Sequence, residues 1–499
     1  MRGIVSAAGY VPFRRLQRSE IAKTFGSGGG KGTRSVASYD EDTTTMGVEA
    51  ARLALRGAPD ASVDALWFAT ADPAYLDKTN ATAIHAALRL DGDRPALDLG
   101  GALRSGVGTL RVALDGAGST LVVSADVRTG LPTSGDEAAG GDGAAAVLVG
   151  DDTTGPVVAE YLAAGSATDE FLDRWRTPGE RRSKVWEERF GETKYVPLGE
   201  QAWQAALKAA ELTPGEVDHL VVAGMHGRAV KALVKRLGTK DGALGDDLTA
   251  TVGNPGTAQA ALLLTAALEA AGPGEVIALV ALADGADVLL FRTTDALGAR
   301  SAARPVAEQV GAATDVPYGK FLTWRGMVTV EPPRRPEPAR VSASAAGRSE
   351  DWKFAFVGSR DRSTGALHLP PSRVSMSGGA LDDMEPAPMA DVPGTIVTFT
   401  IDKLAYSPSP PIVFAVVDFD GGGRFPVELT DVDAADVQIG DRVEMTFRRL
   451  FTADGIHDYF WKARPLRTAA ASRGGGAGAP EQPGPSGSAP KPTREGGER

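Results

Sequence analysis

The chain contains no cysteine in its 499 residues. That absence excludes disulfide bonds, thiolate metal ligands and a cysteine nucleophile. No apolar run reaches the ~20 residues that a helix needs to cross a bilayer, so we predict no membrane-spanning helix and no membrane partner. The apolar stretch in residues 1–15 alternates and contains a proline, which is typical of a first strand and turn rather than a signal peptide. We therefore expect a cytoplasmic protein.

The chain also has no excess of positive charge. Its 53 Lys and Arg residues face 64 Asp and Glu residues, which gives a net charge of -11. This balance argues against nucleic acid as a partner. The hydrophobic share of 42% and the length are enough for two to four domains of ~150 residues each.

A duplicated pattern dominates residues 1–295. Residues 46–70 and 198–224 each read as an amphipathic helix, a polar turn, Val-Asp and a buried apolar strand. Each unit is followed downstream by two apolar strands around a Gly/Asp turn, at residues 119–150 and 275–292. The pattern predicts a duplicated α/β fold, and ligand sites favour the strand ends and junctions of such folds.

The amino-acid composition of residues 296–499 changes from segment to segment. Residues 296–350 are rich in Arg, Pro, Ser and Ala and predict a linker or extended arm. Residues 351–390 are irregular, with a predicted strand at 352–360. Residues 391–466 hold short β-like runs between Gly, Pro and Asp turns, which predict a small all-β barrel. Residues 467–499 lack the apolar content to pack, and we predict that they are disordered.

Several motifs of the first 295 residues resemble the thiolase superfamily, and within it 3-hydroxy-3-methylglutaryl-CoA synthase and the ketoacyl synthase III-like enzymes. They lie at residues 96–110, 125–150, 171–179, 185–198, 223–238 and 251–264. The resemblance implies a duplicated thiolase-like fold with a coenzyme A thioester as substrate and no further cofactor. It also implies a homodimer, or pairing with other thiolase-like subunits. We expect the strand at 119–126 to continue the sheet between two copies.

In that family a cysteine at the start of a helix accepts the acyl group, helped by the helix dipole and a nearby histidine. The matching residue here is Leu103, which cannot be acylated. The histidine and asparagine of the family's oxyanion hole match His226 and Asn254. The family's glutamate acid/base falls at about Ala71, beside Asp72. The resemblance therefore implies that two of four catalytic groups are missing.

Each candidate also has a plainer interpretation. His226 could be a structural histidine at a helix start, and Asn254 stands in an Asn-Pro-Gly sequence that is common in turns. Ser105 could replace the missing nucleophile, although a serine there is more often a cap or packing residue. The resemblance further suggests substrate-binding or pocket-mouth positions at Ser105, Tyr75, Lys78, Gly253 and Gly256.

Residues 351–466 resemble the DUF35 proteins, which pair a rubredoxin-like zinc ribbon with an OB-fold. The four cysteine positions of the ribbon match Asp361, Thr364, Ser375 and Gly378. A tetrahedral zinc needs four good ligands, so we predict no metal here; a chance site of Asp361 with His368 is the weaker alternative. An OB barrel can bind oligonucleotides through aromatic and basic side chains. The candidates are Tyr459, Phe460, Trp461, Arg448, Arg449, Lys462 and Arg464, but we favour alternating core contacts of a barrel strand.

These observations support two main hypotheses. The first is an acyl-CoA protein that makes or breaks a carbon–carbon bond beside the thioester without a cysteine nucleophile. An example is retro-aldol cleavage of a β-hydroxyacyl-CoA, with His226 and Asn254 stabilising the enolate. The second is a catalytically inactive acyl-CoA-binding scaffold, or a partner subunit of an active thiolase-like enzyme. The loss of the cysteine, the glutamate and all four zinc ligands favours the second, whereas the retained His226, Asn254 and glycine framework count against it. The first is our leading hypothesis.

Overall fold

The computed structural model describes residues 1–180, 182–298 and 302–466, so the predicted disordered tail lies outside the described residues. Residues 1–466 form one compact unit. Its centre is a nine-stranded mixed sheet in the order β11-β12-β13-β8-β1-β7-β6-β4-β5. The strands are β1 (Arg2–Tyr10), β4 (Ala65–Ala69), β5 (Ala96–Asp98), β6 (Thr120–Asp126), β7 (Gly143–Asp151), β8 (Ala159–Ala167), β11 (His219–Gly224), β12 (Val276–Leu282) and β13 (Ala286–Thr293).

The sheet has two halves of matching topology, which confirms the duplicated pattern. In the first half β4 is parallel to β6, and β6 is antiparallel to β7. In the second half β11 is parallel to β12, and β12 is antiparallel to β13. The halves join where β1 pairs with β8 at Gly3 and Ile4. Gly3 is required there, because a Cβ at this position would lie 2.0 Å from the Ala159 carbonyl oxygen.

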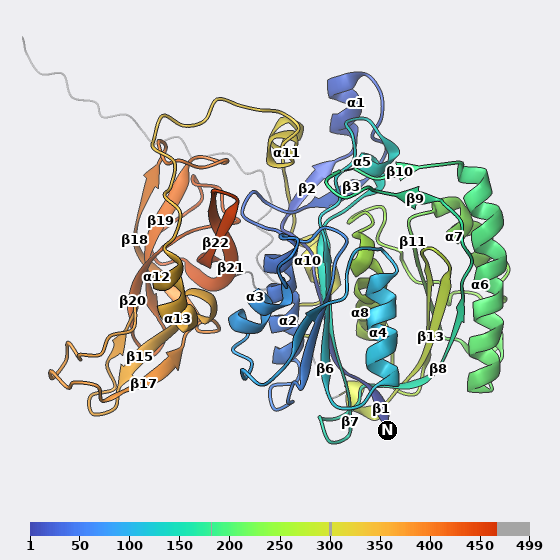
Figure 1. Ribbon diagram of the computed structural model, residues 1–499, viewed down its shortest axis with the longest axis horizontal. Coiled ribbons are helices and arrows are strands. Elements are labelled where there is room, and N and C mark those ends of the chain that lie inside the picture. The colour runs from blue at the N-terminus through green and yellow to red at the C-terminus, as the bar shows by residue number, and fades with distance from the viewer. Residues whose placement is uncertain (181, 299–301, 467–499) are drawn as a thin grey trace, which may run out of the picture. The chain divides into compact units, whose positions relative to one another are not determined.

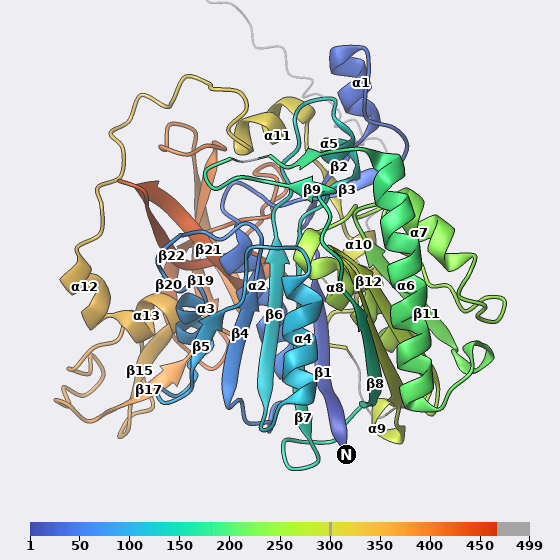
Figure 2. The same cartoon turned by 45° about the vertical axis from the view of Figure 1, so that its right-hand side comes forward.

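Helices form layers on and between the two halves (Figure 1). The middle layer holds α4 (Ser105–Asp115) and α8 (Gln259–Ala270), whose apolar faces share one buried core with both halves. The long helix α6 (Glu188–Ala210) and α7 (Gly227–Val234) cover the outer face of the second half (Figure 2). The helix α2 (Thr43–Arg56) covers the first half, and its core continues into the C-terminal barrel.

The predicted arm at 296–350 is only partly an arm. Its first part folds back onto the N-terminal segment: β14 (Thr314–Asp315) pairs with β2 (Arg14–Gln17). The helices α10 (Val306–Gly311) and α11 (Tyr318–Trp324) lie on either side of β14 in the chain. Helix α11 buries Phe321 against Leu16 and Ile21 of the N-terminal segment. Apolar residues spaced along 306–322 drive this packing, so the arm begins only after α11.

The C-terminal region confirms the predicted barrel and ribbon. The barrel sheet has the order β20-β19-β18-β21-β22, from β18 (Gly394–Asp402), β19 (Ile412–Phe419), β20 (Arg424–Glu428), β21 (Arg442–Ala453) and β22 (Ile456–Pro465). The ribbon-like segment has the order β16-β15-β17, from β15 (Val357–Asp361), β16 (Leu367–His368) and β17 (Met384–Pro388). The strand predicted at 352–360 is wrong in its first half, because Glu350–Ala355 forms α13 and buries Ala355.

Short elements occupy the remaining loops. They are α1 (Ser19–Phe25), β3 (Thr33–Val36), α3 (Ala81–Ala87), α5 (Gly135–Ala139), β9 (Arg174–Trp175), β10 (Lys184–Val185), η1 (Pro214–Glu216), η2 (Gly256–Ala258), α9 (Asp295–Gly298) and α12 (Ala343–Arg348). In the described part of the chain, none of the helices has the length and apolarity required to cross a membrane.

The expected role of residues 119–126 in a dimer is wrong. This segment is β6, and both of its edges are already paired, with β4 and with β7. At this end of the sheet the outermost strand is β5, which pairs only with β4. The apolar character of β6 reflects burial on both faces between helical layers rather than an open edge.

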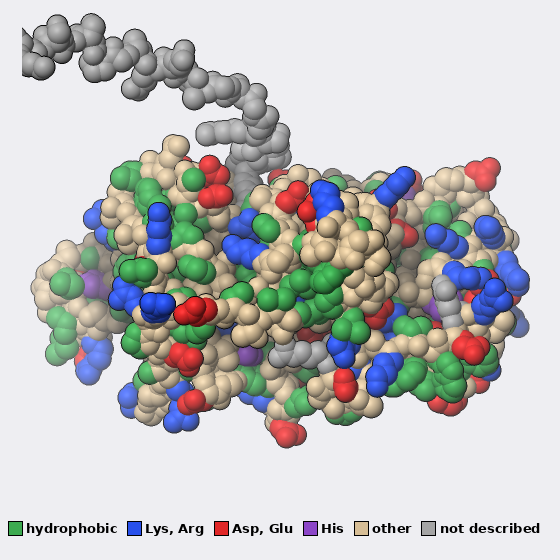
Figure 3. Space-filling model, turned by 90° about the horizontal axis from the view of Figure 1, so that it is seen from above, with side chains coloured by type: hydrophobic (Ala, Val, Ile, Leu, Met, Phe, Trp, Pro, Cys, Tyr) green, Lys and Arg blue, Asp and Glu red, His purple; other side chains and the backbone are tan. Residues whose placement is uncertain are grey.

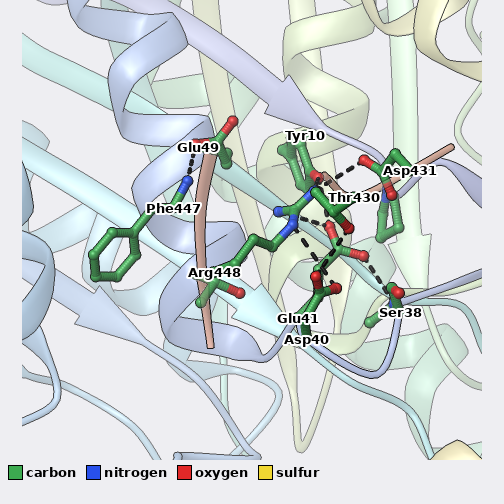
Figure 4. A network of polar contacts seen from close by, with 12 residues as sticks. Tyr10, Ser38, Asp40, Glu41, Glu49, Thr430, Asp431, Phe447 and Arg448 are labelled. Atoms are coloured by element: carbon green, nitrogen blue, oxygen red, sulfur yellow. Dashed lines mark hydrogen bonds and ion pairs between the residues drawn. The ribbon is translucent and has the colours of Figure 1, made fainter. Parts of the chain in front are cut away.

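The basic residues of the barrel are buried against the α/β part of the unit. Arg448 is fully buried, and its guanidinium lies 3.1 Å from Glu41 and 3.0 Å from Asp431 (Figure 4). Lys462, also fully buried, lies 3.2 Å from Asp40 and 2.7 Å from Glu428. These side chains are therefore ion-paired inside the protein, which overturns the oligonucleotide-binding alternative for this face.

Candidate active site at the N-terminus of α4

The candidate site lies where parallel strands of both halves end. Loops that follow β4, β5 and β6 of the first half meet loops that follow β11 and β12 of the second. This is the position at which open α/β sheets bind ligands. Arg104 ties the two halves together, because its Nε lies 2.7 Å from Asp287 and its Nη1 donates to the carbonyl oxygen of Asp284 at 2.9 Å.

Leu103 stands in the turn just before α4 and lines two neighbouring cavities. The smaller, of about 20 Å³, is also lined by Asn254 and Met225. The larger, of about 260 Å³, is also lined by Asp173 and Tyr195. The structure therefore brings the predicted nucleophile position and the predicted asparagine together. The side chain at the helix start is apolar, but open space remains beside it.

His226 is the N-cap of α7 and is 7% exposed. Its Nδ1 accepts a hydrogen bond from the Ala229 backbone N–H at 3.1 Å. In the neutral form of the ring this hydrogen bond places the ring proton on Nε2. His226 also lines a third cavity, of about 560 Å³, together with Asp173 and Met225. The capping role of His226 is therefore present in the structure, and its role toward a substrate stays a prediction.

Asn254 is 4% exposed and holds together the turn in which it stands. Its Nδ2 donates to the Gly224 carbonyl oxygen at 3.0 Å and to Gln259 Oε1 at 2.6 Å, and its Oδ1 accepts from the Gly256 N–H at 2.9 Å. Both amide hydrogens are therefore used within the protein. A contact from Asn254 to a substrate oxygen requires one of these bonds to be exchanged.

The predicted glutamate position, Ala71, lines the 260 Å³ cavity with its small side chain. Its backbone N–H donates to the buried Asp126 carboxylate at 2.8 Å, which also accepts from the Thr257 N–H at 2.8 Å. Asp72 points elsewhere, toward Arg176 at 3.6 Å. Burial and the Asp126 charge raise the pKa of Asp72 to about 6, while Arg176 acts in the opposite direction.

Three of the predicted substrate-binding residues have other contacts. Tyr75 contacts the barrel: its hydroxyl accepts from the His457 N–H at 2.6 Å, and the two rings lie 5.0 Å apart. Gly253 has φ +84, and a Cβ there would lie 2.3 Å from the Gly140 carbonyl oxygen, so chain packing requires this glycine. Lys78 bonds to Thr79 and Thr82.

The other two lie closer to the site. Gly256 lines the 20 Å³ cavity. Ser105 is the first residue of α4, two positions after Leu103.

Sequence reasoning missed Asp173 and Tyr195. Both stand inside motifs that carry the family resemblance, at 171–179 and 185–198, but spacing alone gave them no role. Asp173 lines both the 260 Å³ and the 560 Å³ cavity. Tyr195 donates to Asp173 Oδ2 at 3.3 Å and is 4% exposed. Only the fold shows that a buried carboxylate faces the position of Leu103.

Charged side chains of both signs line the third cavity. Arg174, Arg182 and Lys184 line it, with Arg174 paired to Asp136 at 2.6 Å. Figure 3 looks onto the end of the molecule that carries β9 and β10 and shows Lys and Arg side chains gathered over α6 and α7. Asp136, Asp173 and Glu180 line the same cavity, so the three basic side chains there are balanced by three acidic ones.

At the ribbon, hydrogen bonds occupy the positions of the family's zinc ligands. Asp361 is fully buried, and its Oδ1 accepts from the Ser363 N–H and hydroxyl at 2.8 and 2.7 Å and from the Thr364 N–H at 3.2 Å. The hydroxyls of Ser375, Ser363 and Thr364 hold the pKa of Asp361 well below its usual range. His368 Nε2 accepts from the Met376 N–H at 3.0 Å, so this nitrogen holds the second turn.

Comparisons with known proteins bear on both parts of the chain. A family model described as the C-terminal OB-fold domain of ChsH2 matches residues 388–448. The hydroxymethylglutaryl-CoA synthase of Aeropyrum pernix is 30% identical over 345 residues, which cover 66% of this chain and 95% of that protein. That of Pyrococcus furiosus is 30% identical over 293 residues, covering 57% of this chain and 83% of that protein.

Solved structures show the same fold. An HMG-CoA synthase complexed with CoA superposes with a TM-score of 0.55 at 17% identity, covering 64% of this chain and 89% of that chain. MvaS in complex with 3-hydroxy-3-methylglutaryl coenzyme A gives a TM-score of 0.52 at 18% identity, covering 68% of this chain and 94% of that chain.

Proposed function

The chain belongs to the hydroxymethylglutaryl-CoA synthase family, and from this membership we propose that it makes or breaks a carbon–carbon bond beside the carbonyl of an acyl-CoA thioester. The observation that carries the proposal is the position of Leu103. An apolar side chain replaces the acyl acceptor at the start of α4, yet a cavity of about 260 Å³ remains open beside it, with polar groups in its wall. The reaction then proceeds without an acyl-enzyme.

The chemistry suited to such a site is an aldol or retro-aldol step. In the cleavage direction the β-hydroxyl loses its proton, the Cα–Cβ bond breaks, and the β-carbon becomes a carbonyl. The bond's electron pair moves into the enolate of the thioester. The Nε2–H of His226 can donate to the enolate oxygen, because Nδ1 is occupied by the Ala229 N–H. Asn254 adds a second donor if its bond to Gln259 is exchanged.

The substrate class follows from the relatives and from charge. The curated relatives are named for a CoA ester, and the cavity of about 560 Å³ beside His226 is lined by Arg174, Arg182 and Lys184. Coenzyme A carries several phosphate charges, which such side chains attract. We place the CoA portion on this side and the acyl portion beside Leu103.

A second function has its own support. Both amide hydrogens of Asn254 are used within the protein, and the nucleophile and the glutamate are replaced by Leu103 and Ala71. A chain of this kind could serve as an acyl-CoA-binding scaffold or as the partner subunit of an active thiolase-like enzyme.

One experiment separates the two functions. The purified full chain is incubated with a panel of acyl-CoA and β-hydroxyacyl-CoA thioesters, while affinity is measured by calorimetry and products by mass spectrometry. Cleavage or condensation products support the enzyme, and tight binding without product supports the scaffold. Absence of binding to every thioester contradicts both.

A companion variant tests the absence of an acyl-enzyme. Leu103→Cys places a thiol at the N-terminus of α4, where the helix dipole lowers thiol pKa values. We expect an acetyl adduct on this variant after incubation with acetyl-CoA and none on the wild type. Leu404→Cys, on an exposed residue of the barrel, is the control. A stable adduct on Ser105 of the wild type would make serine the nucleophile and contradict the proposal.

A further inference from the structure

Asp173 is a buried carboxylate with one oxygen unused. Asp173 is 5% exposed and lies in the loop between β8 and β9. Among the described residues, no hydrogen-bond donor reaches its Oδ1. A buried carboxylate without full hydrogen bonding is costly, so such a group in a cavity wall is a candidate for function. Asp173 lines both the cavity at Leu103 and the cavity at His226.

Tyr195 fixes the direction in which Asp173 points. Its hydroxyl donates to Asp173 Oδ2 at 3.3 Å and accepts from the Asp284 N–H at 3.3 Å. Its ring packs edge-on against Phe171 at 5.0 Å, which holds the hydroxyl in place. Burial and the nearby Asp173 charge raise the pKa of Tyr195 above its usual range, so it stays a donor at neutral pH. With Oδ2 occupied, Oδ1 is the oxygen left to act.

His226 and Asp173 face the same point. If Gly191 carried a Cβ, that atom would lie 2.8 Å from both Asp173 Oδ1 and His226 Nε2. The absence of a side chain at Gly191, near the start of α6, therefore lets the carboxylate oxygen and the imidazole nitrogen approach one location. A base next to an oxyanion donor is the pair that enolate chemistry needs.

We propose that Asp173 is the catalytic base of this site, that it shuttles a proton between the substrate's α-carbon and β-oxygen, and that Tyr195 is its positioning residue. This inference rests on the proposed function and names its missing acid/base. In the condensing direction Oδ1 takes a proton from the α-carbon, and the C–H electron pair forms the enolate. The enolate carbon then attacks a carbonyl carbon, and the resulting alkoxide takes the proton back from Asp173. Cleavage is the reverse, so no external oxidant, reductant or acid is required.

Neighbouring carboxylates are less suited to this role. Asp126 is held by the N–H groups of Ala71 and Thr257, and Asp72 faces Arg176 outside the cavity lining. Asp284 lines the same cavity as Asp173 but is exposed, in a turn at φ +46. Partial desolvation at the cavity mouth and the Asp173 charge raise the pKa of Asp284, so it is the competitor to test among the described residues.

Deuterium exchange tests the first half of the shuttle without knowledge of the second substrate. The full chain is incubated with acetyl-CoA in D₂O, and deuterium in the acetyl group is followed by mass spectrometry. We expect exchange in the wild type and a loss of ~10²–10⁴-fold in Asp173→Asn, the usual contribution of a general base. Tyr195→Phe should lose on the order of 10²-fold or less, since it only misplaces the base.

Matched variants separate catalysis from folding. Asp169→Asn, in the same loop but exposed and paired with Lys194, should exchange at the wild-type rate, and Asp284→Asn should retain most of it. Asp173→Asn should keep its acetyl-CoA affinity and its melting temperature, because Oδ1 has no partner to lose. Added formate should restore part of the exchange in Asp173→Ala, which a purely structural role would not allow.

The outcomes distinguish the inference from the proposed function. Acetyl-CoA binding with wild-type exchange in Asp173→Asn would overturn the role of Asp173 and leave the proposed function intact. Binding without any exchange in the wild type would also overturn it, in favour of the scaffold. Loss of exchange in Asp284→Asn with none in Asp173→Asn would move the base to Asp284. A wild type that binds no thioester of the panel would remove the proposed function and this inference together.

Discussion

At the scale of residues, the backbone around the candidate site is held by hydrogen bonds from side chains other than Leu103 and His226. Asp126 is fully buried and holds Ala71 of one half and Thr257 of the other through their N–H groups. Asn254 bonds to Gly224, Gln259 and Gly256 in a similar way. These contacts fix the backbone around Leu103 whatever side chain stands there. Replacement of the nucleophile therefore changes the chemistry without altering the cavity walls.

His226 allows the sharpest test at this scale, because its two nitrogens have separate roles. His226→Ala removes the helix cap and the Nε2 donor, whereas His226→Asn keeps a good N-cap acceptor and removes only Nε2. If Nε2 stabilises an oxyanion, both variants should lose ~10²–10³-fold in turnover. Only His226→Ala should also lose stability, by roughly 1 kcal/mol. Turnover, CoA-ester affinity and melting temperature are measured on each.

Two results would contradict a catalytic role of His226 Nε2. Full turnover in a stable His226→Asn variant would show that the imidazole only caps α7. Equal destabilisation of both variants, with unchanged turnover per folded molecule, would assign it a structural role within the site.

At the scale of elements, hydrogen bonds hold the two turns of the ribbon that match the family's zinc-ligand positions. The turn at Asp361 is closed by three bonds to Oδ1, and the turn that contains Ser375 is held by His368. The two turns touch, since a Cβ on Gly378 would lie 3.3 Å from the Thr364 methyl. The short sheet β16-β15-β17 is thus held at its turns by the hydrogen bonds of Asp361 and His368, which we call the ribbon hydrogen-bond cluster.

We predict that the stability of this ribbon hydrogen-bond cluster depends on Asp361. Asp361→Ala should leave the N–H groups of Ser363 and Thr364 without their acceptor and lower the free energy of unfolding by ~1–3 kcal/mol. Asp382→Asn, which removes the exposed ion pair with Arg373 and keeps a residue type that tolerates the positive φ at this position, should cost ~1 kcal/mol or less. Elemental analysis of the wild type should find well under one equivalent of zinc. Stoichiometric zinc whose removal lowers the melting temperature would mean that the ligands lie elsewhere.

The edge strand β5 is the element through which we expect two copies to pair. It bonds only to β4, and Leu97 and Leu99 are 49% and 38% exposed. An open apolar edge is a template for pairing with a second chain. The variant Leu97→Glu with Leu99→Glu should sediment as a monomer, while Ile439→Glu on the exposed barrel surface should match a dimeric wild type. A monomeric wild type at micromolar concentration would contradict this expectation.

At the scale of the whole molecule, the barrel is attached to the α/β part through buried charge. Glu49 on α2 is 2% exposed, and its carboxylate accepts from Arg52 at 2.7 Å and lies 3.0 Å from Arg464 of the barrel. Arg448 makes the comparable contacts with Glu41 and Asp431 (Figure 4). Buried ions are tolerated only when every partner is present. The two parts of the unit are therefore interdependent for stability.

We predict that this attachment is sensitive to acid. Burial opposes ionisation of Glu49, but Arg52 and Arg464 outweigh it and hold its pKa well below the usual range. A depressed folded-state pKa contributes stability that is complete above the unfolded value of about 4.3 and is lost as the pH falls below it. Glu49→Gln should cost ~3–5 kcal/mol at neutral pH, because it leaves buried guanidinium groups unpaired. The difference from wild type should shrink as the pH falls below about 4.

Urea denaturation across this pH range measures the effect. Asp418→Asn removes an exposed pair with Arg424 and should change stability by ~1 kcal/mol or less at every pH. A Glu49→Gln variant as stable as the wild type at neutral pH would show that the buried network contributes nothing net to the attachment.

The sequence alone determined the repeated elements of the two halves and the strands of the barrel. Periodicity located α2, β4, β6 and β7 and their counterparts in the second half, because apolar spacing is a local property of the chain. It located the five barrel strands for the same reason. Family motifs predicted one site for Leu103, His226 and Asn254; in the structure Leu103 and Asn254 line a common cavity, whereas His226 lines a neighbouring one.

Only the tertiary structure decided what each side chain faces. Strand β6 looks like an open edge in sequence, but it lies inside the sheet because β4 and β7 pair with it from distant positions. Arg448 and Lys462 look like a nucleic-acid face, but they are neutralised by Asp40 and Glu41 some 400 residues away in the chain. Asp173 looks like any loop aspartate until the cavity at Leu103 is formed around it. Burial and charge pairing depend on contacts between remote segments, and no local pattern encodes them.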